Sequence, residues 1–349
     1  MSETRAVRAG EELDLAALNA WIAVNAADVG VVAAVEQFPG GFSNLTYLLK
    51  SERGEFVLRR PPAGVGNGPA HDMAREYRIL SVLSTRSIPA PRPIALCEDV
   101  AVTGAPFYLM ERVRGVILRG STGVAPAPEV MRRLSESFVE TFAAIHSVNA
   151  SDPAIAALGK PDGYIARQIS GWTKRWEASR TDDVPAMDRV AAWLASHQPE
   201  SSRVCLVHND YKYDNLVLDP SDNSRIVGVL DWEMATLGDP LLDVGTSLGY
   251  WVEAGDHPAF RSLGLGVTSL PRNFTRAELW ARYLERTGRS SIGFEFYYAF
   301  GLFKIAVIAQ QIFFRYRKGL TTDERFARLE NAVQLLARTA HRETMASKP

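Results

Sequence analysis

A chain of 349 residues is long enough for two domains, and its net charge of −1 gives no overall field that would attract nucleic acid or a membrane surface. Its hydrophobic content of 46% and charged content of 23% are ordinary for a globular protein. Cys97 and Cys205 lack metal-ligand spacing, and the polar residues 1–13 do not resemble a secretory signal, so we expect a cytoplasmic protein.

The first part of the chain predicts a small lobe built on a sheet. Helices are expected over residues 13–27 and 73–83, and strands near residues 36–38, 45–49, 55–59, 94–98 and 106–111. Glycine-containing turns separate the first three strands. Five strands with one helix inserted after the third form a lobe that we place at residues 1–112, with a hinge over residues 111–115.

The rest of the chain, residues 113–349, predicts a larger and mainly helical lobe. Helices are expected over residues 129–148, 163–180, 187–196 and 294–316, with others after residue 276. A hairpin is expected between residues 216–218 and 226–230, because residues 219–224 between them are dense in turn formers. The apolar run over residues 299–314 is shorter than the ~20 residues of a membrane span, which favours a buried helix.

One segment in this second part carries the chemistry. It reads His208-Asn209-Asp210-Tyr211-Lys212-Tyr213-Asp214-Asn215, and the hairpin that follows it ends in Asp231. Asp210 could orient or deprotonate an alcohol, while Asn215 and Asp231 could hold Mg²⁺ on a nucleoside triphosphate. The alternative is a plain turn, which Asp and Asn residues build well, but the carboxylate of Asp231 at the far end of the hairpin argues against it.

Two neighbours of Asp210 have less specific roles. His208 is better explained as a side chain packed beneath the loop and bonded to backbone than as an acid–base group. Lys212 could offset charge on a transferred phosphoryl group, or it could be a solvated loop lysine; the sequence leaves both interpretations open.

The spacing H-x-D-x-x-x-x-N, followed by a strand that ends in Asp, resembles the catalytic loop and metal-binding Asp of protein-kinase-like phosphotransferases. With Gly238-Asp239-Pro240 and Asp243, the segment resembles the aminoglycoside phosphotransferase and choline kinase-like superfamily, in which we expect Asp239 and Asp243 to be structural. Residues 38–44, 56–62 and 208–212 are most similar to the phosphotransferase-like domain that accompanies acyl-CoA dehydrogenases. The resemblance covers residues 30–340.

This resemblance implies a two-lobed, protein-kinase-like α+β fold, with a small antiparallel sheet in the N-lobe and a larger, mainly helical C-lobe. It also implies an ATP site in the N-lobe. Its expected parts are Gly40, Gly41, Phe42, Ser43 and Asn44 over the phosphates, Arg59 paired with Glu76, and backbone groups of Met110 and Glu111 against adenine. Arg60, on the opposite face of the strand, is the alternative to Arg59. Arg59 stands where most kinases carry lysine, and Arg forks across two acceptors where Lys is a point charge.

The acceptor is expected to be a small molecule with a hydroxyl group. Residues 276–349 carry thirteen Lys and Arg against seven Asp and Glu. A pocket lined by this part of the chain would therefore repel a polycationic antibiotic. Together with the aromatic residues of 294–316, the basic balance favours a hydroxyacyl acid or its CoA thioester. A catalytically silent nucleotide-binding module is the alternative function. A protein kinase is disfavoured, because Asp231-Trp232-Glu233 replaces Asp-Phe-Gly.

Overall fold

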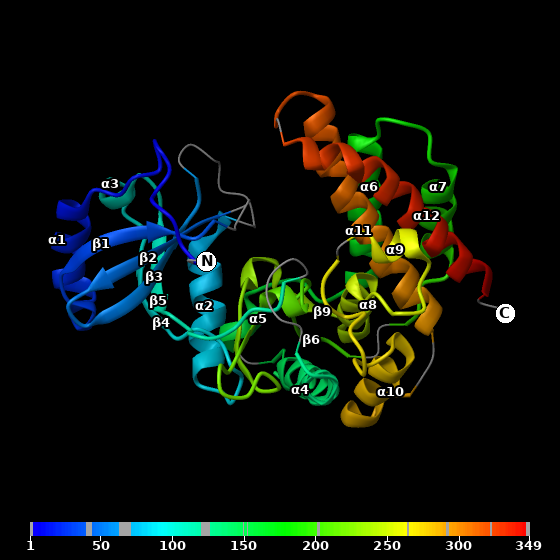
Figure 1. Cartoon of the computed structure of the whole chain (residues 1–349), viewed down its shortest axis with the longest axis horizontal. Helices are drawn as coiled ribbons and strands as arrows, with labels where there is room; N and C mark the ends of the chain where they lie inside the picture. Colours follow the sequence, from blue (N-terminus) through cyan, green and yellow to red (C-terminus); the bar gives the residue numbers. More distant parts are fainter. Residues whose placement is uncertain are drawn as a thin grey trace. The chain divides into compact units, whose positions relative to one another are not determined.

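The computed structural model describes residues 3–39, 44–62, 71–119, 126–148, 150–151, 153–200, 203–263, 265–290, 293–321 and 323–346. The chain divides into two compact units, which Figure 1 traces in sequence colours. The first unit is Met1–Gly115 with Val227–Ala235, and the second is Val116–Ile226 with Thr236–Pro349. Asp231 therefore belongs to the first unit, whereas a single division after residue 112 would place it in the second lobe.

The first unit is built on an antiparallel sheet of five strands in the order β1-β2-β3-β5-β4. The strands are β1 (Val32–Gln37), β2 (Leu45–Ser51), β3 (Gly54–Arg60), β4 (Pro93–Cys97) and β5 (Phe107–Glu111). The helices are α1 (Leu15–Asn25), η1 (Ala27–Val29), α2 (Met73–Ser84) and α3 (Val100–Thr103). The sheet and α1 enclose one apolar core, to which Leu18, Ile22 and Phe107 belong.

Strand β1 begins four residues before the expected position. The side chain of Asn19 on α1 explains the early start, because its amide group bonds both backbone groups of Val32: Oδ1 accepts from the Val32 N–H at 2.8 Å, and Nδ2 donates to the Val32 carbonyl at 3.0 Å. Sequence periodicity does not register a side chain that fixes a distant strand.

The second unit is mainly helical. Its helices are α4 (Pro128–His146), α5 (Pro153–Ala156), α6 (Tyr164–Ser179), α7 (Pro185–Ser196), α8 (Pro240–Tyr250), α9 (Pro258–Arg261), α10 (Arg276–Thr287), α11 (Phe294–Arg317) and α12 (Leu329–Ala346), with short turns η3 (Tyr213–Asn215) and η5 (Glu324–Arg328). Strand β6 (Cys205–Val207) pairs with β9 (Thr236–Gly238). The expected hairpin forms between β7 (Leu216–Leu218) and β8 (Ile226–Val229), and the first unit's segment Val227–Ala235, which includes η4 (Trp232–Met234), begins within β8. Three residues each, β6 and β9 are too short for a periodic signal.

Helix α11 is the central helix of the second unit. Within the part of the chain that the structure describes, it is the one helix long and apolar enough to cross a membrane by length and composition. Most of it is buried inside the unit, however, which fits the core helix that the sequence predicts. Six of its aromatic side chains are buried, namely Phe296, Tyr297, Tyr298, Phe300, Phe303 and Phe313.

Helices α8 and α11 cross with their backbones in direct contact. A Cβ atom at Gly301 would lie 1.9 Å from the carbonyl oxygen of Gly245, and one at Gly245 would lie 2.2 Å from the carbonyl oxygen of Tyr297. Both distances are below any van der Waals contact, so the crossing requires glycine at both positions. It matters for function because each helix carries a side chain that contacts the segment 208–215.

We therefore predict that Gly301→Ala lowers the free energy of unfolding by about 1–3 kcal/mol, the usual cost of overpacking, although alanine favours a helix. Urea unfolding followed by circular dichroism measures the change. Gly255→Ala is the matched control, because nothing lies within 4 Å of its Cβ position. Equal stability of the two variants would contradict the close crossing.

Candidate active site

A cluster in the first unit gathers three carboxylates around one guanidinium group; we call Arg59, Glu76, Asp231 and Glu233 the Arg59 cluster. Arg59 Nε lies 3.2 Å from Glu76 Oε2, and Arg59 Nη2 lies 2.8 Å from Asp231 Oδ1 and 2.6 Å from Glu233 Oε2. Arg59 stands near the end of β3 and Glu76 in the first turn of α2, while Asp231 directly precedes η4 and Glu233 lies within it. The predicted pairing of Arg59 with Glu76 is thus present.

The Arg59 cluster carries more negative than positive charge. Burial opposes the charge on Arg59, but Glu76 and Asp231 outweigh it and raise the pKa of its guanidinium group. Burial raises the pKa of Glu76 against the effect of Arg59, and burial together with Asp231 raises the pKa of Glu233. A further cation at this place would relieve the carboxylates. Among the described residues, though, no group of three or more His, Cys, Asp or Glu could hold a metal ion without other ligands.

Asn44 is hydrogen-bonded to a carboxylate of the Arg59 cluster. It is 1% exposed, its Nδ2 donates to Glu233 Oε2 at 2.8 Å, and its Oδ1 lies 2.9 Å from Nδ1 of His71. Arg75 on α2 donates to the backbone carbonyls of Glu233 and Ala235. Asn44 therefore positions a carboxylate in this structure. The other predicted members of the phosphate loop, Gly40, Gly41, Phe42 and Ser43, lie outside the described residues.

Arg60 has a structural role instead. Its side chain is 3% exposed and donates to the carbonyls of Thr103 and Glu11 and to the hydroxyl of Tyr47. The alternation along β3 thus separates a buried structural arginine from Arg59, which faces the carboxylates.

The predicted adenine contacts on β5 need one correction. Met110 is buried within the sheet, where it pairs with Val57. The backbone N–H of Glu111 donates to the carbonyl of Arg92 at 2.9 Å, because β5 continues its pairing up to this residue. That N–H is therefore already used and is a poor donor to a nucleotide base.

In the second unit, residues 208–215, here called the Asp210 loop, hold one carboxylate between two donors. Lys212 Nζ lies 2.9 Å from both carboxylate oxygens of Asp210. Asn215 Nδ2 donates to the carboxylate and to the backbone carbonyl of Asp210, at 2.9 Å each. Since both donor contacts of Asn215 use its nitrogen, its amide oxygen is directed elsewhere and is available as an acceptor.

Tyr250, the last residue of α8, completes the surroundings of Asp210. Lys212 Nζ lies 4.4 Å from the centre of its ring, and burial together with the charge of Asp210 raises the pKa of its hydroxyl group. Burial lowers the pKa of Lys212, but Tyr250 and Asp210 outweigh burial, so that the pKa of Lys212 is raised. Lys212 is thus a fixed cation paired with Asp210 rather than a solvated loop lysine.

The Asp210 loop is anchored by Asp243, which is buried in the first turn of α8. Its two oxygens accept from the backbone N–H groups of His208 and Asn209, at 2.6 and 2.8 Å, and Nε2 of His146 lies 3.1 Å from Oδ2. Burial favours the neutral form, but the bond from His146 outweighs it and the pKa of Asp243 is lowered. The structural role expected for Asp243 is confirmed, through the loop rather than through a helix cap.

Two further structural expectations are confirmed. Asp239 is the N-cap of α8 and accepts from the N–H groups of Leu241 and Leu242. His208 is fully buried, and its Nδ1 accepts from the backbone N–H of Asp210 at 3.3 Å, so it packs beneath the loop.

Lys304 on α11 is a site residue that the sequence analysis places in an apolar helix without assigning it a role. It is 2% exposed, and its Nζ donates to the backbone carbonyl of Asn209 at 2.8 Å. Its Nζ also lies 5.4 Å from the ring centre of Trp172. Burial lowers the pKa of Lys304 to about 8, against the attraction of Asp243 and Asp210. Asn209 has a left-handed backbone with φ of 66°, which this bond helps to hold.

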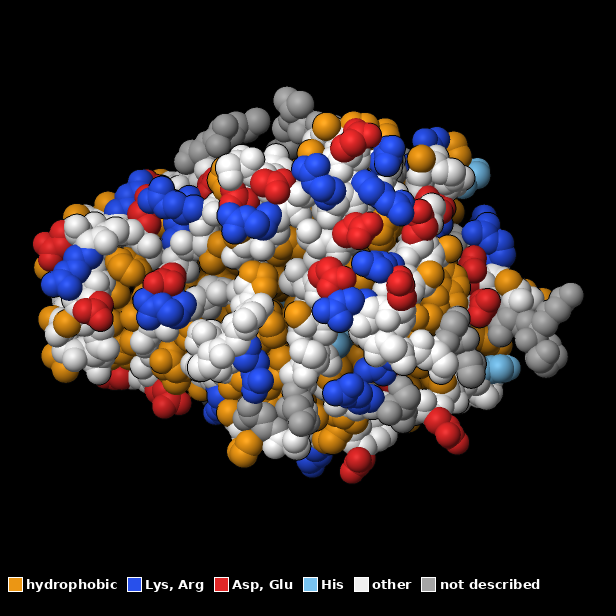
Figure 2. Space-filling model, turned by 90° about the horizontal axis from the view of Figure 1, so that it is seen from below, with side chains coloured by type: hydrophobic (Ala, Val, Ile, Leu, Met, Phe, Trp, Pro, Cys, Tyr) orange, Lys and Arg blue, Asp and Glu red, His pale blue; other side chains and the backbone are white. Residues whose placement is uncertain are grey.

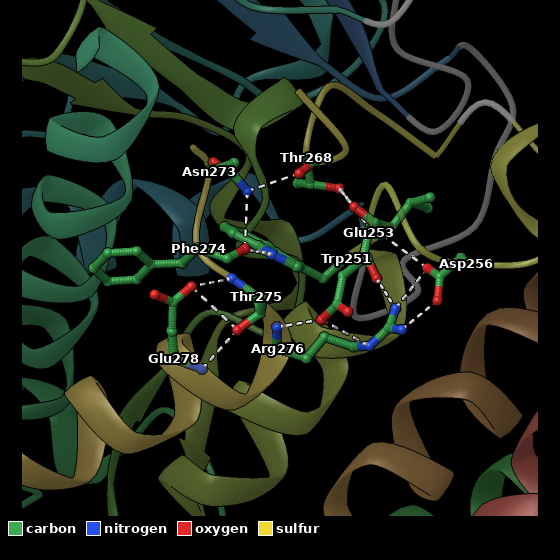
Figure 3. A network of polar contacts seen from close by, with 10 residues as sticks. Trp251, Glu253, Asp256, Thr268, Asn273, Phe274, Thr275, Arg276 and Glu278 are labelled. Carbon is green, nitrogen blue, oxygen red and sulfur yellow. Dashed lines mark hydrogen bonds and ion pairs between the residues drawn. The ribbon is translucent and has the colours of Figure 1, made fainter. Parts of the chain in front are cut away.

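A second polar network fixes the chain after Tyr250 (Figure 3). Arg276 binds Asp256 through both terminal nitrogens and donates to the carbonyl of Trp251 at 2.7 Å. The indole N–H of Trp251 in turn donates to the carbonyl of Phe274 at 2.7 Å. The network ties the end of α8 to the start of α10, and so positions the helix end that carries Tyr250.

The comparisons with known proteins agree with these features. A sequence profile of the phosphotransferase enzyme family matches residues 34–287. The chain belongs to this family. A solved structure from Ralstonia eutropha JMP134, provisionally assigned as an aminoglycoside phosphotransferase, shares 32% identity with a TM-score of 0.82, covering 97% of this chain and 100% of that one. The two-lobed, protein-kinase-like α+β fold is confirmed.

More distant structures share the fold alone. One is a thermostable mutant of aminoglycoside phosphotransferase APH(4)-Ia in complex with AMP-PNP and hygromycin B, with 16% identity and a TM-score of 0.62, covering 94% of this chain and 98% of that one.

Curated relatives confirm the resemblance to the domain that accompanies acyl-CoA dehydrogenases. Acyl-CoA dehydrogenase family member 10 of Mus musculus is 35% identical over 290 residues, or 82% of this chain and 26% of that protein. Family member 11 of Homo sapiens is 33% identical over 333 residues, or 92% of this chain and 41% of that protein. The chain thus spans between a quarter and about two-fifths of these relatives' length.

The titration of Lys304 yields a prediction. Its pKa is about 8 when folded against an ordinary value of 10.5, so between these values the unfolded chain holds a proton that the folded chain has released. This lysine therefore contributes a rise in stability with pH over that window. We predict that the stability of Lys304→Met relative to the wild type falls as the pH rises from 7.5 to 9.5.

Urea unfolding at several pH values measures the difference. Lys318→Met, at the exposed end of the same helix, is the control, and its difference from wild type should not change with pH. A difference that is constant for Lys304→Met as well would show that Lys304 is not a buried titrating cation.

Proposed function

We propose that the chain is an ATP- and Mg²⁺-dependent phosphotransferase that moves the γ-phosphoryl group to a hydroxyl group of a small molecule. The observation that carries the proposal is the Asp210 loop, in which one carboxylate is held by Lys212 and Asn215 on a backbone fixed by Asp243. Phosphoryl transfer requires the protein mainly to position the reacting groups and to neutralise their charge. The Asp210 loop supplies a fixed carboxylate for the first task and a lysine for the second.

The donor set fits the expected metal and nucleotide. Asp231 keeps 35% of its side chain exposed, and the Arg59 cluster has excess negative charge. The amide oxygen of Asn215 is a hard oxygen ligand of the kind that Mg²⁺ takes. We assign Asp231 and Asn215 to the metal and Arg59 to the phosphates; bound Mg²⁺ would neutralise phosphate charge. Solved structures of the same fold hold AMP-PNP, ADP and GDP, which supports a nucleotide as donor.

In the proposed reaction Asp210 binds the acceptor hydroxyl and takes its proton. The hydroxyl oxygen forms the new bond to the γ-phosphorus, while the bond from that phosphorus to the β–γ bridging oxygen breaks and ADP leaves. Lys212 holds the Asp210 carboxylate in place through two contacts of 2.9 Å.

For the acceptor, we propose a hydroxyacyl acid or hydroxyacyl-CoA rather than a polycationic antibiotic. The negative charge of Asp210 acts on two lysines, Lys212 and Lys304, and residues 276–349 are basic in balance. Both features favour an anionic group on the acceptor. The names of the curated relatives, acyl-CoA dehydrogenase family members 10 and 11, point to acyl-CoA chemistry in the same proteins.

The described surface of the chain gives no support to nucleic acid as a partner. On the face shown in Figure 2, the described acidic and basic side chains are interspersed, which is unlike the concentrated basic surface that nucleic acid requires. We propose a cytoplasmic protein that acts without nucleic acid or membrane.

The second candidate is a catalytically silent nucleotide-binding module. It is favoured by the contact of Arg59 with Asp231, because a guanidinium 2.8 Å from the metal carboxylate competes with the cation. Turnover decides between the two, since only the phosphotransferase forms ADP in step with a phosphorylated acceptor.

We predict that Asp210→Asn lowers kcat by about 10²–10⁴-fold while the Kd for Mg-ATP stays within about twofold, because Asp210 contacts the acceptor proton and not the nucleotide. ADP formation is measured with Mg²⁺ over a panel of hydroxy acids, hydroxyacyl-CoAs, sugars, amino alcohols and aminoglycosides. Asp222→Asn in the β7–β8 turn is the control. ATP binding without turnover on any acceptor would support the silent module, and unchanged turnover by Asp210→Asn would remove Asp210 from its role.

We also predict that Arg59→Ala weakens Mg-ATP binding by about tenfold or more, because a charge-assisted bond to phosphate contributes about 1.5–3 kcal/mol. Isothermal titration calorimetry measures the affinity independently of turnover. Arg53→Ala, on the exposed β2–β3 turn, should bind like the wild type. If both variants bind ATP equally well, Arg59 does not contact the phosphates and its only role is to pair with the three carboxylates.

A further inference from the structure

The second unit contains a pocket, away from Asp210, that is lined by basic groups. It lies where α4 and α10 end and has a volume of about 320 Å³. We call it the arginine pocket, and its lining is Ala143, Ala144, His146, Ser147, Arg203, Arg286, Thr287 and Arg289. Three of the eight lining residues are arginines and none is an acid. The volume exceeds that of a single phosphate group.

Two of the three arginines, Arg286 and Arg203, are placed so that guanidinium nitrogen atoms remain for a ligand. Arg286 binds Glu140 through Nε, which fixes its guanidinium plane. Its two terminal nitrogens have no acceptor among the described residues. Arg203 forms no ion pair within the described part of the chain and is exposed to solvent. An arginine whose plane is already fixed loses little freedom when it binds an oxyanion through its terminal nitrogens.

The pocket is connected to the Asp210 loop through one buried side chain. His146 lines the pocket and is 2% exposed. Its Nδ1 lies 2.6 Å from the hydroxyl of Tyr283, and its Nε2 lies 3.1 Å from Asp243, which accepts from the N–H groups of His208 and Asn209. Two side chains therefore separate the pocket from the backbone on which Asp210 stands.

The arginines of this pocket do more than neutralise the negative ends of the helix dipoles. The C-termini of α4 and α10 expose carbonyl oxygens, and nearby cations stabilise such ends. That role would be met by Arg286 and Arg289, close to the end of α10. Arg203, however, belongs to neither helix and precedes β6, yet it lines the same pocket.

We propose that the arginine pocket is a second ligand site, which binds a phosphate-bearing anion and is coupled to the Asp210 loop through His146 and Asp243. Phosphate suits the pocket because its oxygens match the forked guanidinium groups. The site is distinct from the acceptor and nucleotide groups, so its test does not depend on phosphoryl transfer.

The first experiment is calorimetric titration of the full chain with inorganic phosphate. We expect saturable binding to the wild type, and at least about tenfold weaker binding to Arg203→Gln/Arg286→Gln, since each charge-assisted bond contributes strongly. Arg203→Gln alone, at an exposed position, gives a weaker loss and guards against misfolding of the double variant. Arg315→Gln/Arg317→Gln, two exposed arginines at the end of α11, is the matched control and should bind like the wild type. Equal affinity of the pocket and control variants would overturn the site.

Three titrants identify the ligand class. Inorganic phosphate, glycerol 3-phosphate and acetate carry a free phosphate, a phosphate ester and a carboxylate. Binding of the first two with pocket-dependent affinity supports the proposal, and preference for acetate would overturn it.

The coupling is measured by NMR of the chain labelled with ¹⁵N-histidine, which contains six histidines. His146→Gln identifies the ring resonance of His146. We expect phosphate to shift this resonance and that of His208, and to leave His257 and His341 unchanged. Pocket-dependent binding without any shift at His208 would overturn the coupling.

Discussion

Asp243 holds the second unit's chemistry in place through a single buried carboxylate. It accepts from two successive backbone N–H groups and from an imidazole, and all three bonds would be lost without it. The geometry of Asp210 follows from this constraint, because two backbone N–H groups fixed at His208 and Asn209 leave the next residue little freedom. Lys304 holds the same segment through the other backbone group of Asn209: its Nζ donates to the Asn209 carbonyl.

The two clusters have different charge balances. Arg59 is one cation among three carboxylates, while Asp210 is one carboxylate bound by a lysine and an amide. A further cation is thus favoured at the first, whereas the carboxylate of Asp210 is already balanced by its lysine. The two clusters belong to separate units of the chain.

The sequence predicts the parts of the site that have local patterns. The spacing of Asp210 and Asn215, the alternation that separates Arg59 from Arg60, and the helix that carries Glu76 are all short-range features. Glu233 and Lys304 could not be assigned, because their roles depend on partners far apart in the chain: Glu233 is 174 residues from Arg59, and Lys304 is 95 residues from Asn209. A charged residue in an apolar helix such as α11 was the available signal for Lys304. The hydrogen bond from the Glu111 N–H to the Arg92 carbonyl could not be predicted either, because the residue at which a strand ends depends on its pairing with other segments.

The glycine crossing of α8 and α11 limits how this protein can change over evolution. Asp243 and Tyr250 stand on one helix and Lys304 on the other, so any residue larger than glycine at the crossing would move both sets together. The segment between α8 and α10 is held by the Arg276 network instead, so its residues can change without separating the two helices. Relatives that keep this fold should therefore keep both glycines, whatever else in the second unit changes.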